Sequence, residues 1–364
     1  MLQEAYSLTN NYGVHKQWRL FTGSYNTASE EAIEVLLFDD EQGTIERLGG
    51  GGGIEQPSFL TADSKGRILF AVSEVDDGEV SSFKVAADGR GLELISKQPT
   101  GGAAPCHLLL DESERWLLLV NYSGGTIVAY PVQEDGAIGP AVQTIRHEGE
   151  SVNKDRQEGP HPHSIFLEPH SGHWFVPDLG TDHIYVYQLN KEDGQLGLLS
   201  KTAAQPGSGP RHAAFHPDGT VVYIINELNS SVSVYAYDPA TGALHHLQTI
   251  DTLPVATSQE SYCADIHVDG DGRFLYASNR GHDSITVFAI GEQGKLSLSG
   301  HAPGGGRTPR NFALLPGGRH LLVANQDSDN IVAMRIGEDG IPVPNGNVYQ
   351  TVRPVCIYPV AVVE

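Results

Sequence analysis

The feature that most constrains the fold is a repeated pair of short apolar runs separated by a polar turn. Each copy begins at a proline, and a polar residue ends the second run sixteen positions later. The complete pairs are Pro57 and Ser73, Pro105 and Asn121, Pro162 and Asp178, Pro210 and Asn226, and Pro309 and Asn325. A further copy lacks the proline but keeps the spacing, from Cys263 to Asn279.

The spacing of the copies indicates the architecture. Successive copies start 48, 57, 48, 53 and 46 residues apart. Short β-rich runs bounded by Gly, Asp and Asn at such intervals are typical of four-stranded propeller blades. The repeats show no helical period, which excludes stacked helical hairpins, and they lack the Gly-His and Trp-Asp signatures of the WD-repeat class. The 42 glycines also suit a fold with many tight turns.

The two ends of the chain complete the repeat. A seventh start, Pro354, lies 45 residues after Pro309, but the chain ends ten residues later. Residues 18–26 have the pattern of a second strand, and the run from Ile33 has that of a third. A blade shared by both ends would close the ring and hide the sheet edges. The sequence predicts one domain over residues 1–364, an all-β, seven-bladed propeller with four antiparallel strands per blade and an N-terminal extension at residues 1–17.

The charge balance limits the partners. The chain has 45 acidic and 23 basic residues, a formal net charge of -22 and no basic run. Nucleic acid and anionic membranes are therefore not expected partners, because both require a positive surface. The N-terminal residues do not resemble a signal peptide, no apolar run approaches the length of a membrane span, and three cysteines are too few for a disulfide framework. We expect a cytoplasmic protein with reduced cysteines.

The repeat also predicts where chemistry is located. The first strand starts at the proline and the second ends at the polar residue, so both positions lie at the same end of a blade. Because innermost strands line the axis, equivalent positions meet at one mouth of the channel. The residues directly after these positions in blades three to six include His163, Arg211, Glu227, Arg280 and Arg310. Three arginines at one mouth of an acidic protein predict an anion site, and the two longest loops, residues 146–162 and 251–262, fall on the same rim.

Several segments resemble a known family. They are GPHPHS, FVPDLGTDHIYVY, GPRHAAFHPDGTVVYIINELNSSVSVY and ADIHVDGDGRFLYASNRGHDSITVF. They are similar to the seven-bladed lactonases, which include the bacterial propeller-type 6-phosphogluconolactonase and the fungal carboxy-cis,cis-muconate cyclase. The resemblance runs from about Leu20 to the C-terminus. It implies lactone chemistry and a catalytic cluster of one histidine, two arginines and one glutamate, at His163, Arg211, Arg280 and Glu227.

For hydrolysis, we expect Arg211 and Arg280 to bind the anionic substituent of the lactone and the developing oxyanion, because the planar guanidinium matches phosphate and carboxylate. Either Glu227 or His163 would activate water, and the other would orient the water or protonate the leaving alkoxide. Arg310 is either a substrate contact or a packing residue. No metal-ligand spacing such as His-Glu-x-x-His is present, so we expect no metal or cofactor.

Three functions remain open from the sequence. The leading hypothesis is hydrolysis of 6-phosphoglucono-1,5-lactone, a carboxylic ester, in the pentose phosphate route. The second is a muconate-type lactone-forming cyclase, and the third is a non-catalytic propeller that binds a protein partner. The arginines argue against the third, because protein-binding surfaces usually present aromatic and apolar anchors. Arg211 and Glu227 could also form a purely structural ion pair between adjacent strands.

Overall fold

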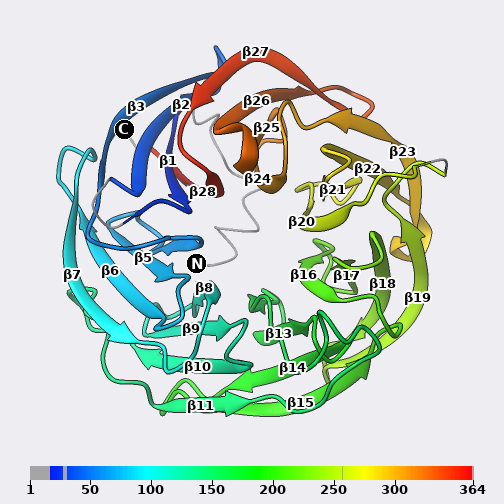
Figure 1. The fold of residues 1–364 in the computed structure, drawn as a ribbon, viewed down its shortest axis with the longest axis horizontal. Helices are drawn as coiled ribbons and strands as arrows, with labels where there is room; N and C mark the ends of the chain where they lie inside the picture. Colours follow the sequence, from blue (N-terminus) through cyan, green and yellow to red (C-terminus); the bar gives the residue numbers. More distant parts are fainter. Residues whose placement is uncertain (1–16, 28–30, 256, 363–364) are drawn as a thin grey trace.

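The structure, a computed structural model, describes residues 17–27, 31–255 and 257–362. Seven four-stranded antiparallel sheets surround a central axis like the blades of a propeller (Figure 1). The fold prediction is confirmed. The expected N-terminal extension, residues 1–17, lies outside the described residues except for Gln17, which begins the first strand.

Each blade lists its strands from the axis outward. Blade 1 contains β4 (Leu60–Ala62), β5 (Ile68–Ser73), β6 (Glu79–Val85) and β7 (Leu92–Pro99). Blade 2 contains β8 (Pro105–Leu110), β9 (Trp116–Asn121), β10 (Thr126–Pro131) and β11 (Gln143–Arg146). Blade 3 contains β12 (Phe166–Leu167), β13 (His173–Asp178), β14 (His183–Leu189) and β15 (Leu196–Ala203).

The second half of the ring follows the same order. Blade 4 contains β16 (Pro210–Phe215), β17 (Val221–Asn226), β18 (Ser231–Asp238) and β19 (Ala243–Asp251). Blade 5 contains β20 (Tyr262–Val268), β21 (Phe274–Arg280), β22 (Ser284–Ile290) and β23 (Leu296–Pro303). Blade 6 contains β24 (Pro309–Leu314), β25 (His320–Asn325), β26 (Asn330–Ile336) and β27 (Pro342–Gln350). In the described residues, helical turns occur only at Glu292–Gly294 and Gln326–Ser328.

The closing blade joins the two ends of the chain. Its strands are β28 (Pro354–Ala361), β1 (Gln17–Ser24), β2 (Ile33–Asp39) and β3 (Thr44–Gly51). The C-terminal strand β28 pairs antiparallel with β1, with Trp18 opposite Ala361 and Gly23 opposite Cys356. The shared blade is therefore as predicted, and the ring closes through hydrogen bonds between the chain ends.

The repeated polar residue at the end of each second strand has a structural role. Pro210 lies opposite Asn226, which is fully buried, and the Asn226 Nδ2 group donates to Ser231 Oγ at 2.9 Å and Ser233 Oγ at 3.0 Å. Asn279 makes the equivalent bonds in blade 5. Because a buried amide must be hydrogen-bonded, the repeat preserves this residue type within the blade.

The expectation that every first strand starts at its proline is wrong in two blades. In blade 1 the strand begins at Leu60, and in blade 3 the strand consists of Phe166 and Leu167 alone. An isolated bridge between Pro162 and Asp178 and a bond from the His163 amide to the Pro177 carbonyl, at 3.1 Å, still hold the chain beside β13. The ladder is interrupted, but the end of the blade is where the repeat placed it.

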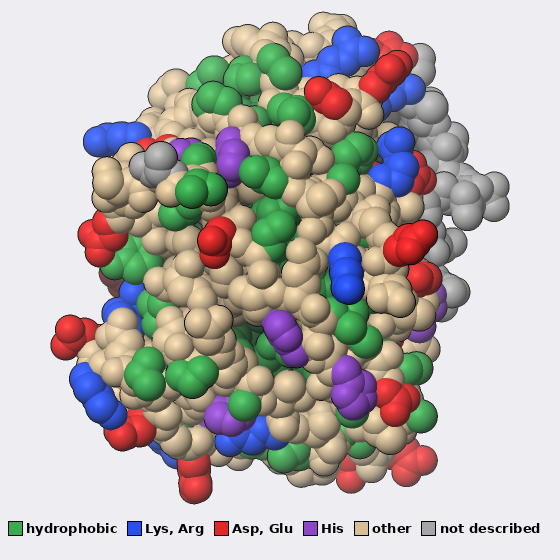
Figure 2. All heavy atoms as spheres, turned by 90° about the vertical axis from the view of Figure 1, so that its right-hand side faces the viewer, with side chains coloured by type: hydrophobic (Ala, Val, Ile, Leu, Met, Phe, Trp, Pro, Cys, Tyr) green, Lys and Arg blue, Asp and Glu red, His purple; other side chains and the backbone are tan. Residues whose placement is uncertain are grey.

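Apolar side chains fill the spaces between neighbouring blades. Trp116 of blade 2 and Trp174 of blade 3, for example, share one buried cluster. All three cysteines are buried and unpaired. In the side view of Figure 2, acidic and basic side chains are interspersed over the visible face. The described part of the chain contains no helix long and apolar enough to cross a membrane.

Candidate active site

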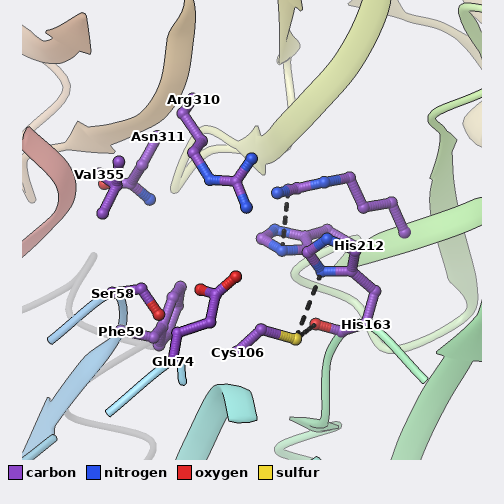
Figure 3. Close-up of a pocket in the computed structure, with 10 residues that line it drawn as sticks. Ser58, Phe59, Glu74, Cys106, His163, His212, Arg310, Asn311 and Val355 are labelled. Carbon is purple, nitrogen blue, oxygen red and sulfur yellow. Dashed lines mark hydrogen bonds between the residues drawn. The ribbon is translucent and has the colours of Figure 1, made fainter. Parts of the chain in front are cut away.

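A pocket lies at the centre of the ring, where the first strands of the blades begin (Figure 3). Its lining residues are Ser58, Phe59, Glu74, Cys106, His163, Arg211, His212, Arg310, Asn311 and Val355. Six of these directly follow a repeat start, namely Ser58, Cys106, His163, Arg211, Arg310 and Val355. The structure thus brings together equivalent positions from six blades.

Glu227, which directly follows β17, is held by three arginines. Arg211 Nε on β16 donates to Glu227 Oε2 at 3.0 Å, and Arg280 Nη2 at the end of β21 donates to the same oxygen at 2.9 Å. Arg156, from the loop between β11 and β12, donates from Nη2 to Oε1 at 2.6 Å. We call these four residues the Glu227 cluster. The ion pair between Arg211 and Glu227 that the sequence left open as a structural alternative is therefore formed.

The charge of the cluster determines the state of its carboxyl group. Burial alone would raise the pKa of Glu227, but the three guanidiniums together hold it well below its ordinary value. The side chain is only 5% exposed, so solvent screens these ion pairs little. Glu227 is therefore a permanent carboxylate near neutral pH and a weak proton acceptor.

Arg211 is fixed from its other side by a buried chain of hydrogen bonds. Its Nη1 group donates to the Ala264 carbonyl at 2.6 Å and to His212 Nε2 at 3.0 Å. Because Arg can only donate, His212 accepts at Nε2 and donates from Nδ1 to Asp265, 2.9 Å away. Burial and the charge of Arg211 lower the pKa of His212 to about 4. The guanidinium of Arg211 is thus held in one orientation.

His163 lies between the pocket and the Glu227 cluster. Its Nε2 atom is 4.0 Å from Glu227 Oε2, and its Nδ1 atom is 3.8 Å from Cys106 Sγ. Burial and the positive charge of Arg211 hold the pKa of His163 well below its ordinary value, so the imidazole is neutral. The Cys106 thiol donates to the His163 carbonyl at 3.1 Å, and burial raises its pKa, so it is no nucleophile at neutral pH.

The other side of the pocket carries a second, less saturated group, which we call the Glu74 face: Glu74, Tyr25 and Arg310. The Tyr25 hydroxyl lies 3.0 Å from both Glu74 carboxylate oxygens. The guanidinium of Arg310 lies 5.3 Å from the centre of the Tyr25 ring. Figure 3 shows Arg310 and Glu74 extending into the pocket from opposite sides. Within the described parts of the chain, no hydrogen bond or ion pair involves the Arg310 guanidinium.

The five residues selected from the sequence are placed in two ways. His163, Arg211 and Arg310 line the pocket, whereas Glu227 and Arg280 lie behind this lining, joined to it through the Glu227 cluster. Sequence reasoning missed Arg156, Glu74 and Tyr25. Glu74 had a usable signal, because it follows Ser73 as Glu227 follows Asn226. Arg156 had only its place in the longest rim loop, and Tyr25 lies outside the repeat.

Comparison with known proteins agrees with this geometry. The family model for the lactonase with a 7-bladed beta-propeller matches residues 19–359. This chain belongs to that family. The prediction of a lactonase, and hence of a carboxylic-ester hydrolase, is confirmed at this level. No group of three or more His, Cys, Asp or Glu side chains that could hold a metal ion occurs in the described ranges.

Relatives of this lactonase cover nearly its whole length. It is 38% identical to a 6-phosphogluconolactonase of Formosa agariphila over 327 residues, which are 87% of this chain and 92% of the relative. It is 31% identical to the 6-phosphogluconolactonase of Bacillus subtilis over 314 residues, 86% of this chain and 89% of the relative. The solved periplasmic gluconolactonase of Pseudomonas aeruginosa superposes with a TM-score of 0.88 at 32% identity, over 95% of this chain and 99% of that protein.

Proposed function

We propose that this lactonase hydrolyses 6-phosphoglucono-1,5-lactone to 6-phosphogluconate. Relatives that share most of its length carry the name of this activity. The observation that carries the proposal is Arg310, whose guanidinium faces the pocket without an ion-pair partner among the described residues. A guanidinium binds phosphate through two parallel hydrogen bonds. Arg310 therefore holds the phosphate, and the substrate is a small anionic lactone.

The Glu227 cluster stabilises the reacting carbonyl. Arg211 spends its Nε and Nη1 groups on Glu227, Ala264 and His212, and its Nη2 group has no partner in the described structure. This remaining donor faces the oxygen on which negative charge develops during attack. Arg280, bound to the same carboxylate, adds positive charge beside it. Donors fixed in advance stabilise such an oxyanion without reorganising during the reaction.

His163 activates the water. As the water oxygen attacks the lactone carbonyl carbon, the neutral imidazole takes a water proton, and a tetrahedral oxyanion forms. When the ring C–O bond breaks, the imidazolium returns the proton to the leaving alkoxide, so that one water is added in total. Glu227 remains ionised throughout, and its Oε2 atom, 4.0 Å from His163 Nε2, stabilises the imidazolium. This assigns the base to His163 rather than Glu227.

Alanine substitutions of the strand arginines test the site. In an assay that follows release of 6-phosphogluconate, corrected for spontaneous hydrolysis, we expect Arg211→Ala to lower kcat by about a hundred-fold or more. Arg280→Ala, whose side chain is 15% exposed, gives a second variant if the first folds poorly. Unchanged turnover in a folded variant would remove the assigned site. Turnover of a carboxymuconolactone alone, in the same assay, would replace the sugar lactone by the cyclase-type substrate.

The same proposal includes the setting. We place the reaction in the cytoplasm, as a step of the pentose phosphate route. The three unpaired cysteines suit a reducing compartment. The solved Pseudomonas aeruginosa relative is described as a periplasmic gluconolactonase, so a phosphate group on the substrate is the feature that separates the two reactions. Fractionation of cells with antibody detection tests the location.

A further inference from the structure

Glu74 is a pocket carboxylate whose acceptor capacity is largely unfilled. It lines the pocket directly after β5. Among the described residues, the carboxylate receives a single donor, the Tyr25 hydroxyl, and forms no ion pair. Two ionised oxygens offer about four acceptor sites. The remaining sites of Glu74 therefore face the pocket.

The contrast with Glu227 shows what this carboxylate is not arranged to do. Both oxygens of Glu227 are bound by guanidiniums that neutralise its charge. Glu74 keeps its negative charge without a paired cation, and Arg310, which extends from the opposite side of the pocket, stays beyond ion-pair distance. A partly buried carboxylate in this state is stabilised by hydrogen-bond donors that a ligand supplies.

The chemistry of the two candidate substrates differs at this point. A sugar δ-lactone carries ring hydroxyls, and a hydroxyl that donates to an ionised carboxylate makes a strong, charge-assisted hydrogen bond. A muconate-derived lactone carries carboxylates instead of ring hydroxyls. Placing such a carboxylate beside Glu74 brings two like charges together, which disfavours binding.

We propose that Glu74 is a specificity-determining residue: it accepts hydrogen bonds from the ring hydroxyls of the substrate and excludes lactones that carry carboxylates in their place. This inference rests on the proposed lactone hydrolysis and deepens it. Tyr25 holds the Glu74 carboxylate in position, and Arg310 binds the phosphate on the other side. The Glu74 face thus recognises the substrate, whereas His163 and the Glu227 cluster act on its carbonyl.

The test compares Glu74→Gln with Glu55→Gln, which removes an exposed carboxylate outside the pocket lining in the same segment of the chain. With 6-phosphoglucono-1,5-lactone, we expect Glu74→Gln to raise KM about ten- to hundred-fold, since a hydrogen bond to a charged group is lost. The value of kcat should stay within about threefold. Carboxymuconolactone, used as an inhibitor, should bind the variant about fivefold or more tightly than the wild type, because the like charge is gone. Glu55→Gln should change none of these values.

Other results would overturn the inference. A fall in kcat at constant KM would make Glu74 a proton-transfer group, and equal weakening of both ligands would make its role structural. Tyr25→Phe, which frees the carboxylate but keeps its charge, should raise KM less than Glu74→Gln. Calorimetric titration with glucose 6-phosphate, which has the hydroxyls and the phosphate but no lactone carbonyl, separates the two proposals. If the wild type hydrolyses neither lactone, the proposed function fails, and a tenfold weaker glucose 6-phosphate affinity in Glu74→Gln would still support hydroxyl recognition; equal affinity would refute it.

Discussion

The two sides of the pocket use the same residue types in opposite ways. In the Glu227 cluster, one carboxylate is bound by three arginines, and a buried chain through His212 and Asp265 fixes one of them further. On the Glu74 face, the carboxylate has one tyrosine donor and Arg310 has no ion-pair partner in the described residues. The difference is one of saturation rather than of composition.

Saturation separates preorganisation from recognition. Groups that are fully bound to each other before substrate arrives can stabilise a transition state without moving, but they have few donors or acceptors left for a ligand. Groups with unfilled capacity can bind a ligand, but they are less rigid. A propeller brings both kinds to one mouth because each blade contributes its residues independently.

The strongest way to break this contrast is Glu227→Gln. The substitution leaves three guanidiniums around a neutral amide in a site that is 5% exposed. Removing one partner of a buried ion pair typically costs about 3–5 kcal/mol, and we expect the free energy of unfolding to fall by this amount. With Arg211 no longer held, kcat should fall by about a hundred- to thousand-fold. Denaturant unfolding and steady-state kinetics measure the two effects.

Glu74→Gln is the matched control for stability. Because Glu74 is partly exposed and forms no ion pair in the described structure, its substitution should change the free energy of unfolding by less than about 1 kcal/mol. Equal destabilisation by the two glutamine variants would show that the two sides do not differ in saturation.

Acid should act on the saturated side through its histidines. Burial lowers the pKa of His163, of His212, to about 4, and of their neighbour His107. Below pH 6.5 the unfolded chain takes up protons that these folded imidazoles do not, so the free energy of unfolding falls as the pH falls. Each histidine contributes about 1.4 kcal/mol per pH unit, down to its folded pKa. Denaturant unfolding between pH 7 and pH 5 should therefore show a loss of several kcal/mol.

The variant His107→Phe sharpens this measurement. The His107 ring packs against Phe59, with 4.0 Å between ring centroids, and its Nε2 atom has no hydrogen-bond partner. A phenyl ring can therefore replace it without leaving a new polar group unpaired, and the pH slope should fall by about one third. A slope that is flat in the wild type, or unchanged in the variant, would contradict the assignment of neutral buried histidines.

How much the sequence predicts depends on whether a residue belongs to the repeat. The repeat predicted seven blades and their closure, because its spacing recurs in every copy and β28 had to find partners at the other end of the chain. It also brought His163, Arg211 and Arg310 to one pocket, since equivalent positions share one end of the blades. The choice of base stayed open, because ion pairing across three blades cannot be deduced from spacing.

Arg156 shows the limit, because its position depends on a loop without a repeated counterpart. The loop is held by Gln157, whose Nε2 donates to the Leu179 carbonyl at 2.8 Å, and by Ser151, whose Oγ donates to Asp182 at 2.6 Å. These contacts arise from one local conformation, and they direct the neighbouring arginine across the mouth to Glu227. Neither composition nor period predicts such a conformation.

The smallest effect should follow from removing this third arginine. In Arg156→Gln, the two strand arginines still bind Glu227, and the lost side chain was 36% exposed, so that solvent already screened its charge. We expect kcat/KM to fall about two- to tenfold and the free energy of unfolding to change by less than about 1 kcal/mol. The matched control is Lys154→Gln, which removes a cation from the same loop but breaks only an exposed pair with Glu150. A loss as large as that of Glu227→Gln would mean that the loop, not the strands, holds the carboxylate, and the contrast between a rigid cluster and a receptive face would no longer stand.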